Sequence, residues 1–189
     1  MTQRDYAEGA IRRCGADDTA DMLAIINAAA EAYRGIIPAD RWHEPYMSSD
    51  EFASELANGV TFSGCETRDR LIGVMGVQRC HNVDLIRHAY VLPEWQGQGI
   101  GARLLGHLCQ NAERPILIGT WAAAGWAIRF YEQHGFARVG DDDIAPLLRT
   151  YWTVPERQIA TSVVLASPPL AGAAAEQLIA AATATTFPE

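Results

Sequence analysis

A glycine-rich segment between an apolar stretch and a helical pattern constrains the fold of this chain more than any other feature. Residues 91–105 read VLPEWQGQGIGARLL, with glycines at every second position: Gly97, Gly99 and Gly101. Glycine has no Cβ, so backbone N–H groups at the start of a helix can come close to a ligand. The N–H groups of the first helical turn are unpaired and carry partial positive charge. The segment therefore predicts a strand, a tight loop and a helix that together bind a pyrophosphate.

Closely spaced glycines also occur in other kinds of nucleotide-binding loop. Gly97-x-Gly99-x-x-Ala102 fits a loose dinucleotide-binding fingerprint, which normally follows the first strand of its domain. Here about ninety residues precede it, and Gly119-Thr120-Trp121 stands where an acidic residue would hold a ribose. A P-loop is excluded because no Gly-Lys-Ser/Thr follows. A glycine-rich turn that binds nothing remains the structural alternative.

Changes of hydrophobic period along the chain predict the order of helices and strands. Period-2 or compact apolar segments indicate strands at residues 10–13, 60–65, 71–79, 85–91, 115–119, 136–139 and 158–165. Helical spacing follows Asp17-Asp18 and recurs at about 49–57, after the glycine loop, and at 126–134. This order predicts an α/β (α+β) domain with a mixed central sheet, covering residues 1–166. Pro168-Pro169 opens an Ala/Pro-rich tail, residues 167–189, with a helix-compatible piece near 170–181.

Composition and charge narrow the class of protein. A formal net charge of −8 over 189 residues argues against nucleic-acid binding by bulk electrostatics. The four cysteines have no paired spacing and no His stands at a zinc-ligand interval, so we expect reduced thiols and no metal. The polar residues 1–8 lack an apolar signal core and no apolar run is long enough to span a bilayer. We therefore expect a cytoplasmic protein that does not associate with a membrane.

Two motifs together resemble a known family. Val91-x-Pro93-x-x-Gln96-x-x-Gly99-x-Gly101 is similar to the acetyl-CoA signature of the GNAT superfamily of N-acetyltransferases. Residues 127–136, AIRFYEQHGF, resemble that family's Ala-x-x-Phe-Tyr-x-x-x-Gly-Phe helix and strand. The motifs come in the family's order and at its usual separation, and the order of elements agrees from residue 11 to residue 165. The resemblance implies a GNAT-type, mostly antiparallel central sheet with flanking helices and a splayed strand pair that binds the coenzyme.

The resemblance also implies a set of coenzyme-binding residues. Backbone groups of the strand end, the glycine loop and the second motif would contact acetyl-CoA; the residues are Ala89, Tyr90, Val91, Gln96, Gly97, Gln98, Gly99, Ile100, Gly101, Ala102, Ala127 and Phe130. The apolar residues Ile86, Ala89 and Val91 break strict alternation. One extra residue near Arg87-His88, a β-bulge, would explain the break.

The reaction implied is acetyl transfer from acetyl-CoA to a primary amine of a small molecule or of a peptide or protein N-terminus, by direct attack. Tyr131 matches the family position that commonly protonates the leaving thiolate, and core packing is its structural alternative. The base is less defined, because Arg87 and Leu85 stand where some relatives carry a carboxylate or His. His88 is our candidate; the other titratable groups considered are His81, Glu31, Glu44 and Asp84. Ala124 replaces an Asn common in the family.

The resemblance implies an acceptor side built from the first two helices, the loop between them and the last hairpin. That region carries Tyr33, Trp42, His43 and Tyr46, whose rings could contact an amine by cation–π interaction, although core packing is the commoner use. The missing Asn and the undefined base leave one alternative open, a non-catalytic acyl-CoA-binding or regulatory module. The apolar tail helix needs a surface to pack on, and a homodimer is one way to supply it.

Overall fold

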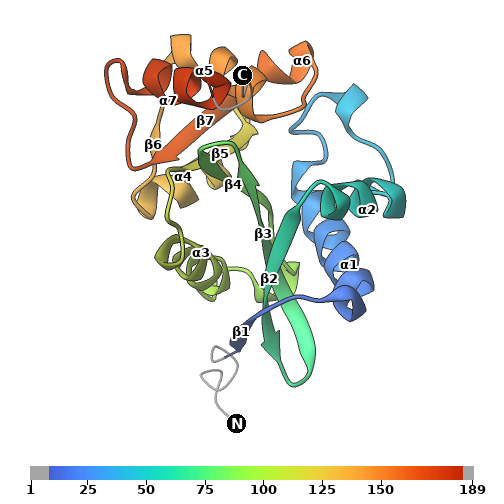
Figure 1. The fold of residues 1–189 in the computed structure, drawn as a ribbon. Coiled ribbons are helices and arrows are strands. Elements are labelled where there is room, and N and C mark those ends of the chain that lie inside the picture. Colours follow the sequence, from blue (N-terminus) through green and yellow to red (C-terminus); the bar gives the residue numbers. More distant parts are fainter. Residues whose placement is uncertain (1–8, 185–189) are drawn as a thin grey trace. The chain divides into compact units, whose positions relative to one another are not determined.

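A computed structural model describes residues 9–184 (Figure 1). The chain forms two compact units. One unit comprises residues 1–78 and 86–111, and the other comprises residues 79–85 and 112–189. Within the described residues the strands hydrogen-bond in the order β1-β2-β3-β4-β5-β7-β6, with β3 and β4 passing through both units. The predicted mixed α/β sheet is confirmed. The polar segment 1–8 and residues 185–189 of the tail lie outside the described residues.

The sheet of the first unit is a meander. Strands β1 (Ala10–Arg13), β2 (Val60–Thr67) and β3 (Arg70–Cys80) pair antiparallel in sequence, and β4 (Val83–Val91) follows. The turn between β2 and β3 places Arg68 and Asp69 at φ values of 49° and 59°. Two successive left-handed residues are typical of a type I′ turn, whose twist matches the flanking strands. The predicted hairpin therefore forms at the predicted polar turn.

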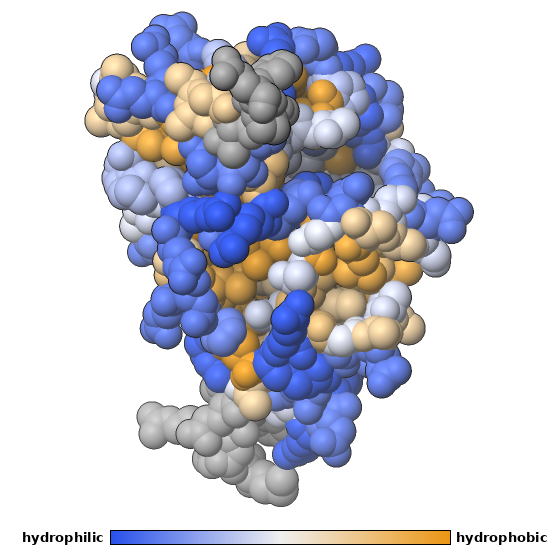
Figure 2. All heavy atoms as spheres, viewed as in Figure 1, coloured by the Kyte–Doolittle hydropathy of each residue, from blue (hydrophilic) through white to orange (hydrophobic). Residues whose placement is uncertain are grey.

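Helices cover both faces of this meander. Helices α1 (Thr19–Ala30) and α2 (Ser49–Ala57) lie on one face and α3 (Ile100–Gln110) lies on the other (Figure 1). Short 3-10 turns η2 (Ala16–Asp18), η3 (Glu31–Tyr33), η4 (Ala39–Arg41) and η5 (Pro93–Trp95) join them. The core beneath α1 and α2 contains Met22, Ile25, Ile26, Phe52, Phe62, Leu71 and Val74. Hydrophilic residues cover most of the face in view, and hydrophobic ones reach the surface in the middle of the view and around α1 (Figure 2).

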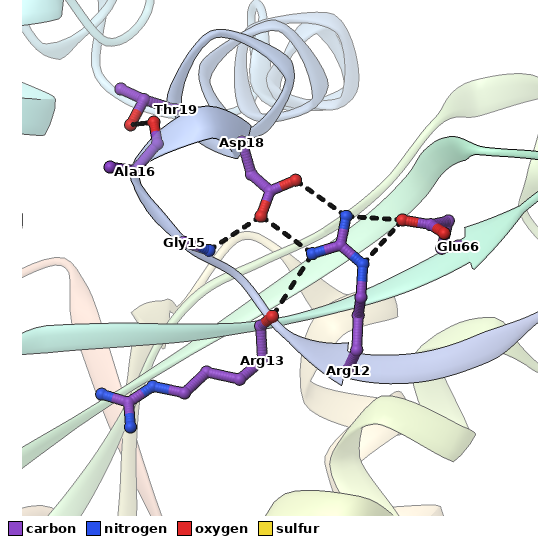
Figure 3. A network of polar contacts seen from close by, with 7 residues as sticks. All are labelled: Arg12, Arg13, Gly15, Ala16, Asp18, Thr19 and Glu66. Carbon is purple, nitrogen blue, oxygen red and sulfur yellow. Dashed lines mark hydrogen bonds and ion pairs between the residues drawn. The ribbon is translucent and has the colours of Figure 1, made fainter.

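An ion network ties the start of α1 to the edge of the sheet (Figure 3). Arg12 of β1 donates from Nη1 and Nη2 to the two carboxylate oxygens of Asp18, each over 2.8 Å, and from Nε to Glu66 of β2 over 2.6 Å. Asp18 also accepts the backbone N–H of Gly15 over 2.7 Å. The hydrogen bonds from Arg12 and Gly15 lower the pKa of Asp18 from 3.8 to about 2. The network therefore fixes where α1 leaves the sheet.

The second unit contains a small antiparallel sheet under helices. Strand β7 (Ser162–Ser167) pairs with β5 (Ile116–Trp121) on one side and with β6 (Ala137–Arg138) on the other. Its helices are α4 (Gly125–Gln133), α5 (Asp141–Tyr151), α6 (Glu156–Ile159) and α7 (Ala174–Ala184). The core contains Val83, Leu85, Leu117, Leu147, Leu148, Val164 and Ala166.

The end of the chain differs from the sequence-based expectation in two ways. Helices α5 and α6 were not predicted, and the strand expected at 158–165 begins only at Ser162 because α6 occupies the residues before it. The apolar tail helix is α7, which packs on α5 of the same chain and buries Ala175 and Ala182. Its packing therefore does not require a second subunit, and a homodimer and the domain boundary at residue 166 stay predictions.

One polar cluster holds α7 in place. The Tyr151 hydroxyl lies 2.8 Å from Asn82 Oδ1 and 2.9 Å from the Leu178 carbonyl, which also accepts from Asn82 Nδ2 over 2.9 Å. Burial raises the pKa of Tyr151 to about 12.

No helix within residues 9–184 has the length and apolar character needed to cross a membrane.

Candidate functional site

The glycine loop adopts the backbone conformation that its residues permit. Gly97 and Gly99 have φ values of +73° and +79°, in the left-handed region where a side chain is strained. Gly99 is the N-cap of α3. A Cβ built on either glycine would meet no heavy atom within 4 Å, and both residues are exposed. The space in front of the loop is therefore open to a ligand.

The loop leaves hydrogen-bond donors available. Within the described residues, the backbone N–H groups of Gly97, Gln98 and Gly99 donate to no protein acceptor, and the first helical bond runs from Arg103 to Gly99. Two side chains brace the turn from outside, since Gln96 Nε2 donates to the Val91 carbonyl over 3.0 Å and Gln98 Nε2 donates to the Glu94 carbonyl over 3.2 Å. Free N–H groups beside a helix N-terminus can bind an anion such as a phosphate.

Helix α3, which follows the glycine loop, packs against the core. Ile100, Leu104 and Leu105 are each at most 2% exposed, so one face of α3 is fully buried. This is the apolar face that the helical spacing predicted, and it fixes the direction of the α3 N-terminus.

Strand β4 contains the irregularity predicted from its broken alternation. His88 has a φ of +50° in the middle of the strand, a conformation that a regular strand never uses. Consecutive strand residues normally point to opposite faces. Here Arg87 Nη2 lies 2.9 Å from Glu55 Oε1 and His88 Nε2 lies 3.0 Å from Glu55 Oε2. Two successive side chains therefore contact the same carboxylate on α2.

The electrostatics of this trio follow from its partial burial. Burial alone would raise the pKa of Glu55, but the hydrogen bond from His88 and the charge of Arg87 hold that pKa below its ordinary value. The carboxylate therefore stays ionised at neutral pH. Phe62 stacks on the His88 ring with centroids 6.1 Å apart.

The predicted acceptor residues gather around one tyrosine. Tyr46 stacks on Tyr33 at 6.3 Å and on His43 at 6.4 Å, and its ring centroid lies 5.6 Å from that of Trp42. Tyr90 of β4 meets the edge of Tyr33 at 6.4 Å. The structure therefore brings together residues that are up to 57 positions apart in an aromatic cluster beside β4.

A second feature of this region is a groove between α1 and α2. Its volume is about 620 Å³, and Ala20, Leu23, Asn27 and Phe52 are among its lining residues. None of Tyr33, Trp42 and His43 lines it. The aromatic cluster and the groove are thus separate features of the first unit.

The second motif forms its predicted helix and turn in the other unit. Tyr131 on α4 is 6% exposed, with Phe130 at 5.0 Å and Phe136 at 5.8 Å between ring centroids. Gly135 ends the helix region with a φ of +86°. Ala124, in place of the family's Asn, is fully buried just before α4. Tyr131 therefore belongs to a packed aromatic group.

Comparison with known proteins decides the family. A family model described as an acetyltransferase (GNAT) domain matches residues 25–145, more than half of the chain. The chain belongs to the GNAT acetyltransferase family. An uncharacterised protein of Mycobacterium leprae (strain TN) is 33% identical over 95 residues, 47% of this chain. The match covers 26% of that relative, so the chain spans about a quarter of its length.

Solved structures share the GNAT fold at low sequence identity. A GNAT-family acetyltransferase of Staphylococcus aureus Mu50 has a TM-score of 0.62 at 16% identity, covering 83% of this chain and 96% of that one. A PaiA N-acetyltransferase of Thermoplasma acidophilum, in complex with coenzyme A, scores 0.61 at 16% identity, with the same coverage. The ribosomal-protein-S18-alanine N-acetyltransferase of Escherichia coli scores 0.60 at 18% identity, covering 84% and 92%.

The remaining candidate bases have other partners in this GNAT domain. Glu31 and Glu44 both form ion pairs with Arg34, and Asp84 lies 3.7 Å from Arg79. His81 is exposed in the turn between β3 and β4. The residue that the sequence did not reveal is Glu55, because nothing in α2 marks one carboxylate among several on an exposed helix.

No metal site is formed by the described part of the chain. Within residues 9–184, no group of three or more His, Cys, Asp or Glu side chains could hold a metal ion. The four cysteines are free thiols. A reaction without a metal stays a prediction.

Proposed function

We propose that the chain transfers the acetyl group of acetyl-CoA to a primary amine. The observation that carries this proposal is the open glycine loop at the N-terminus of α3, with unpaired N–H groups and left-handed Gly97 and Gly99, in a GNAT-family chain. One structural relative is a complex with coenzyme A, which supports acetyl-CoA as the donor. Another is named as a ribosomal-protein-S18-alanine N-acetyltransferase, which supports an amine as the acceptor.

The coenzyme would be held mainly by backbone groups. We assign the pyrophosphate to N–H groups between Gln96 and Ala102. We assign the pantetheine arm to the main chain of residues 89–91, where the resemblance implies that β4 separates from its neighbour. Ala127 and Phe130 of α4 would contact the coenzyme as well. Acetyl-CoA supplies an activated thioester, and the protein residues supply orientation and proton transfer.

Two side chains are assigned to proton transfer. As the new C–N bond forms and the C–S bond breaks, the amine must lose a proton and the sulfur must gain one. We assign the first proton to His88, whose Nδ1 makes no hydrogen bond within the described residues. We assign the second to Tyr131, whose ordinary pKa of about 10 suits donation to a thiolate.

The acceptor amine would enter beside the aromatic cluster. Tyr33, Trp42 and His43, joined by Tyr46, offer ring faces and edges to a cation or an apolar side chain. A small amine and a peptide or protein N-terminus both fit this chemistry. A cytoplasmic location, in which the free thiols stay reduced, fits as well.

The test is direct. Coenzyme A binding is measured by calorimetry, and acetyl-CoA is then incubated with amines, amino acids and peptides carrying free N-termini while thiol release is followed. We expect saturable binding and acceptor-dependent thiol release. Tight binding without turnover on any acceptor would favour the alternative, a non-catalytic acyl-CoA-binding or regulatory module, which the replacement of the family's Asn by Ala124 supports.

A further inference from the structure

We propose that Glu55 is a positioning residue for acetyl transfer, which holds His88 in the one tautomer that can accept a proton from the acceptor amine. The inference rests on the proposed function, because His88 needs a defined lone pair only if it acts as a base. Nothing in the sequence pairs these residues, which lie 33 positions apart on α2 and β4.

The bulge in β4 creates the pairing. With regular alternation, Arg87 and His88 would project from opposite faces of the sheet, and one of them would be out of reach of α2. The left-handed φ of His88 turns its side chain to the face that Arg87 already occupies. A non-glycine residue in this conformation is uncommon, and such residues concentrate at functional sites.

The hydrogen bond between Glu55 and His88 selects the tautomer. An ionised carboxylate only accepts hydrogen bonds, so the proton between Glu55 Oε2 and His88 Nε2 must be carried by Nε2. In the neutral ring the lone pair then lies on Nδ1. Because Glu55 stays ionised, the neutral His88 ring carries its proton on Nε2 at every pH where the neutral ring is present.

The other contacts of Glu55 make it a rigid partner. Arg87 Nη2 lies 2.9 Å from Oε1 and 2.8 Å from Oε2, while Arg87 Nη1 donates to Gln78 Oε1 over 2.7 Å. Gln78 in turn donates to the Asn58 carbonyl at the end of α2 over 2.9 Å. The side chains of Glu55 and His88 are only 23% and 14% exposed, so little water competes for the bond between them. Phe62 stacks on the imidazole from one side.

The arrangement has the logic of a carboxylate that orients a catalytic histidine. If Glu55 only held α2 against β4, its ion pair with Arg87 would be enough. A hydrogen bond to one particular nitrogen of His88 would then not be needed. The two roles therefore predict different results when the carboxylate becomes an amide.

The experiment compares Glu55→Gln with Asp50→Asn, which neutralises an exposed carboxylate on the same helix. Nitrogen NMR of the imidazoles, with His88→Gln used to assign the His88 signals, reports the tautomer without turnover. In the wild-type chain we expect Nε2 protonated and Nδ1 bare at alkaline pH. In Glu55→Gln we expect a mixture, because an amide can either donate or accept.

Kinetics supply the second readout. We expect Glu55→Gln to lower kcat at least about tenfold and to keep KM for acetyl-CoA within about twofold of wild type. The reason is that Glu55 orients the His88 imidazole and does not bind the coenzyme. Asp50→Asn should leave both unchanged. A wild-type His88 protonated on Nδ1, or a Glu55→Gln variant with wild-type tautomer and kcat, would overturn the role of Glu55. A wild-type chain with the expected tautomer that acetylates no amine would instead overturn the proposed function.

Discussion

Replacing Gly99 by Ala separates the two properties that we assign to the glycine loop. Gly99 has a φ of +79°, and a Cβ there would meet no protein atom within 4 Å. The cost to the free protein is therefore backbone strain alone, about 1–2 kcal/mol for a left-handed L-residue. Reduced freedom of the unfolded chain returns about 0.4–1 kcal/mol. We expect a net loss of about 1 kcal/mol, equivalent to a fall in Tm of about 2–4 °C.

The effect on coenzyme binding should be larger. The methyl group would occupy the open space where the pyrophosphate is proposed to approach the α3 N-terminus, so at least one charge-assisted hydrogen bond would be lost. Such a bond contributes about 1.5–3 kcal/mol, which corresponds to about a 10- to 150-fold rise in Kd. Calorimetric titration with coenzyme A measures this change, and a thermal melt of the same sample measures the stability.

The chain supplies a matched control in the same helix. A Cβ on Gly106 also meets nothing within 4 Å, but this glycine lies inside α3 rather than at its start. Gly106→Ala should stabilise the protein by about 0.5–1 kcal/mol, because Ala has the higher helix propensity. Its Kd for coenzyme A should equal that of wild type. If Gly99→Ala bound coenzyme A as tightly as Gly106→Ala, the loop would not be the pyrophosphate site.

Three further outcomes are expected. Tyr131→Phe should lower kcat about 100-fold or more without changing coenzyme A affinity; full activity would leave Tyr131 as a packing residue. Because the pKa of Asp18 is lowered from 3.8 to about 2, its pairing with Arg12 stabilises the fold fully above pH 4 and loses that effect toward pH 2. We expect Asp18→Asn to lower the free energy of unfolding by about 1 kcal/mol or less at neutral pH, because the pair is partly exposed to solvent. In urea unfolding this loss should shrink between pH 4 and pH 2, and a constant loss would contradict the pairing. Tyr151→Phe should destabilise the fold by about 1 kcal/mol, and an unchanged urea midpoint would show that its hydroxyl does not hold α7.

The sequence predicted well those features that are determined locally. The left-handed glycines of the loop, the buried face of α3 and the hairpin turn at Arg68 depend on residues within a few positions of one another. The bulge near His88 was also visible, because it shifts the alternation of a single strand. The helix at Asp141–Tyr151 was not predicted, although three aspartates lead it and its leucines have helical spacing.

Local sequence was enough to predict the glycine loop and the family, because a strand, a glycine loop and a helix in series need only local chain geometry to form. The surroundings of the candidate base depend instead on how distant elements pack. Glu55 and His88 meet because a bulge turns one side chain toward a helix that folds onto the sheet from far away in the sequence. The hydrophobic periodicity of the sequence cannot predict such a contact. The contact depends on the register between two distant elements, whereas periodicity describes the spacing of residues within a single element.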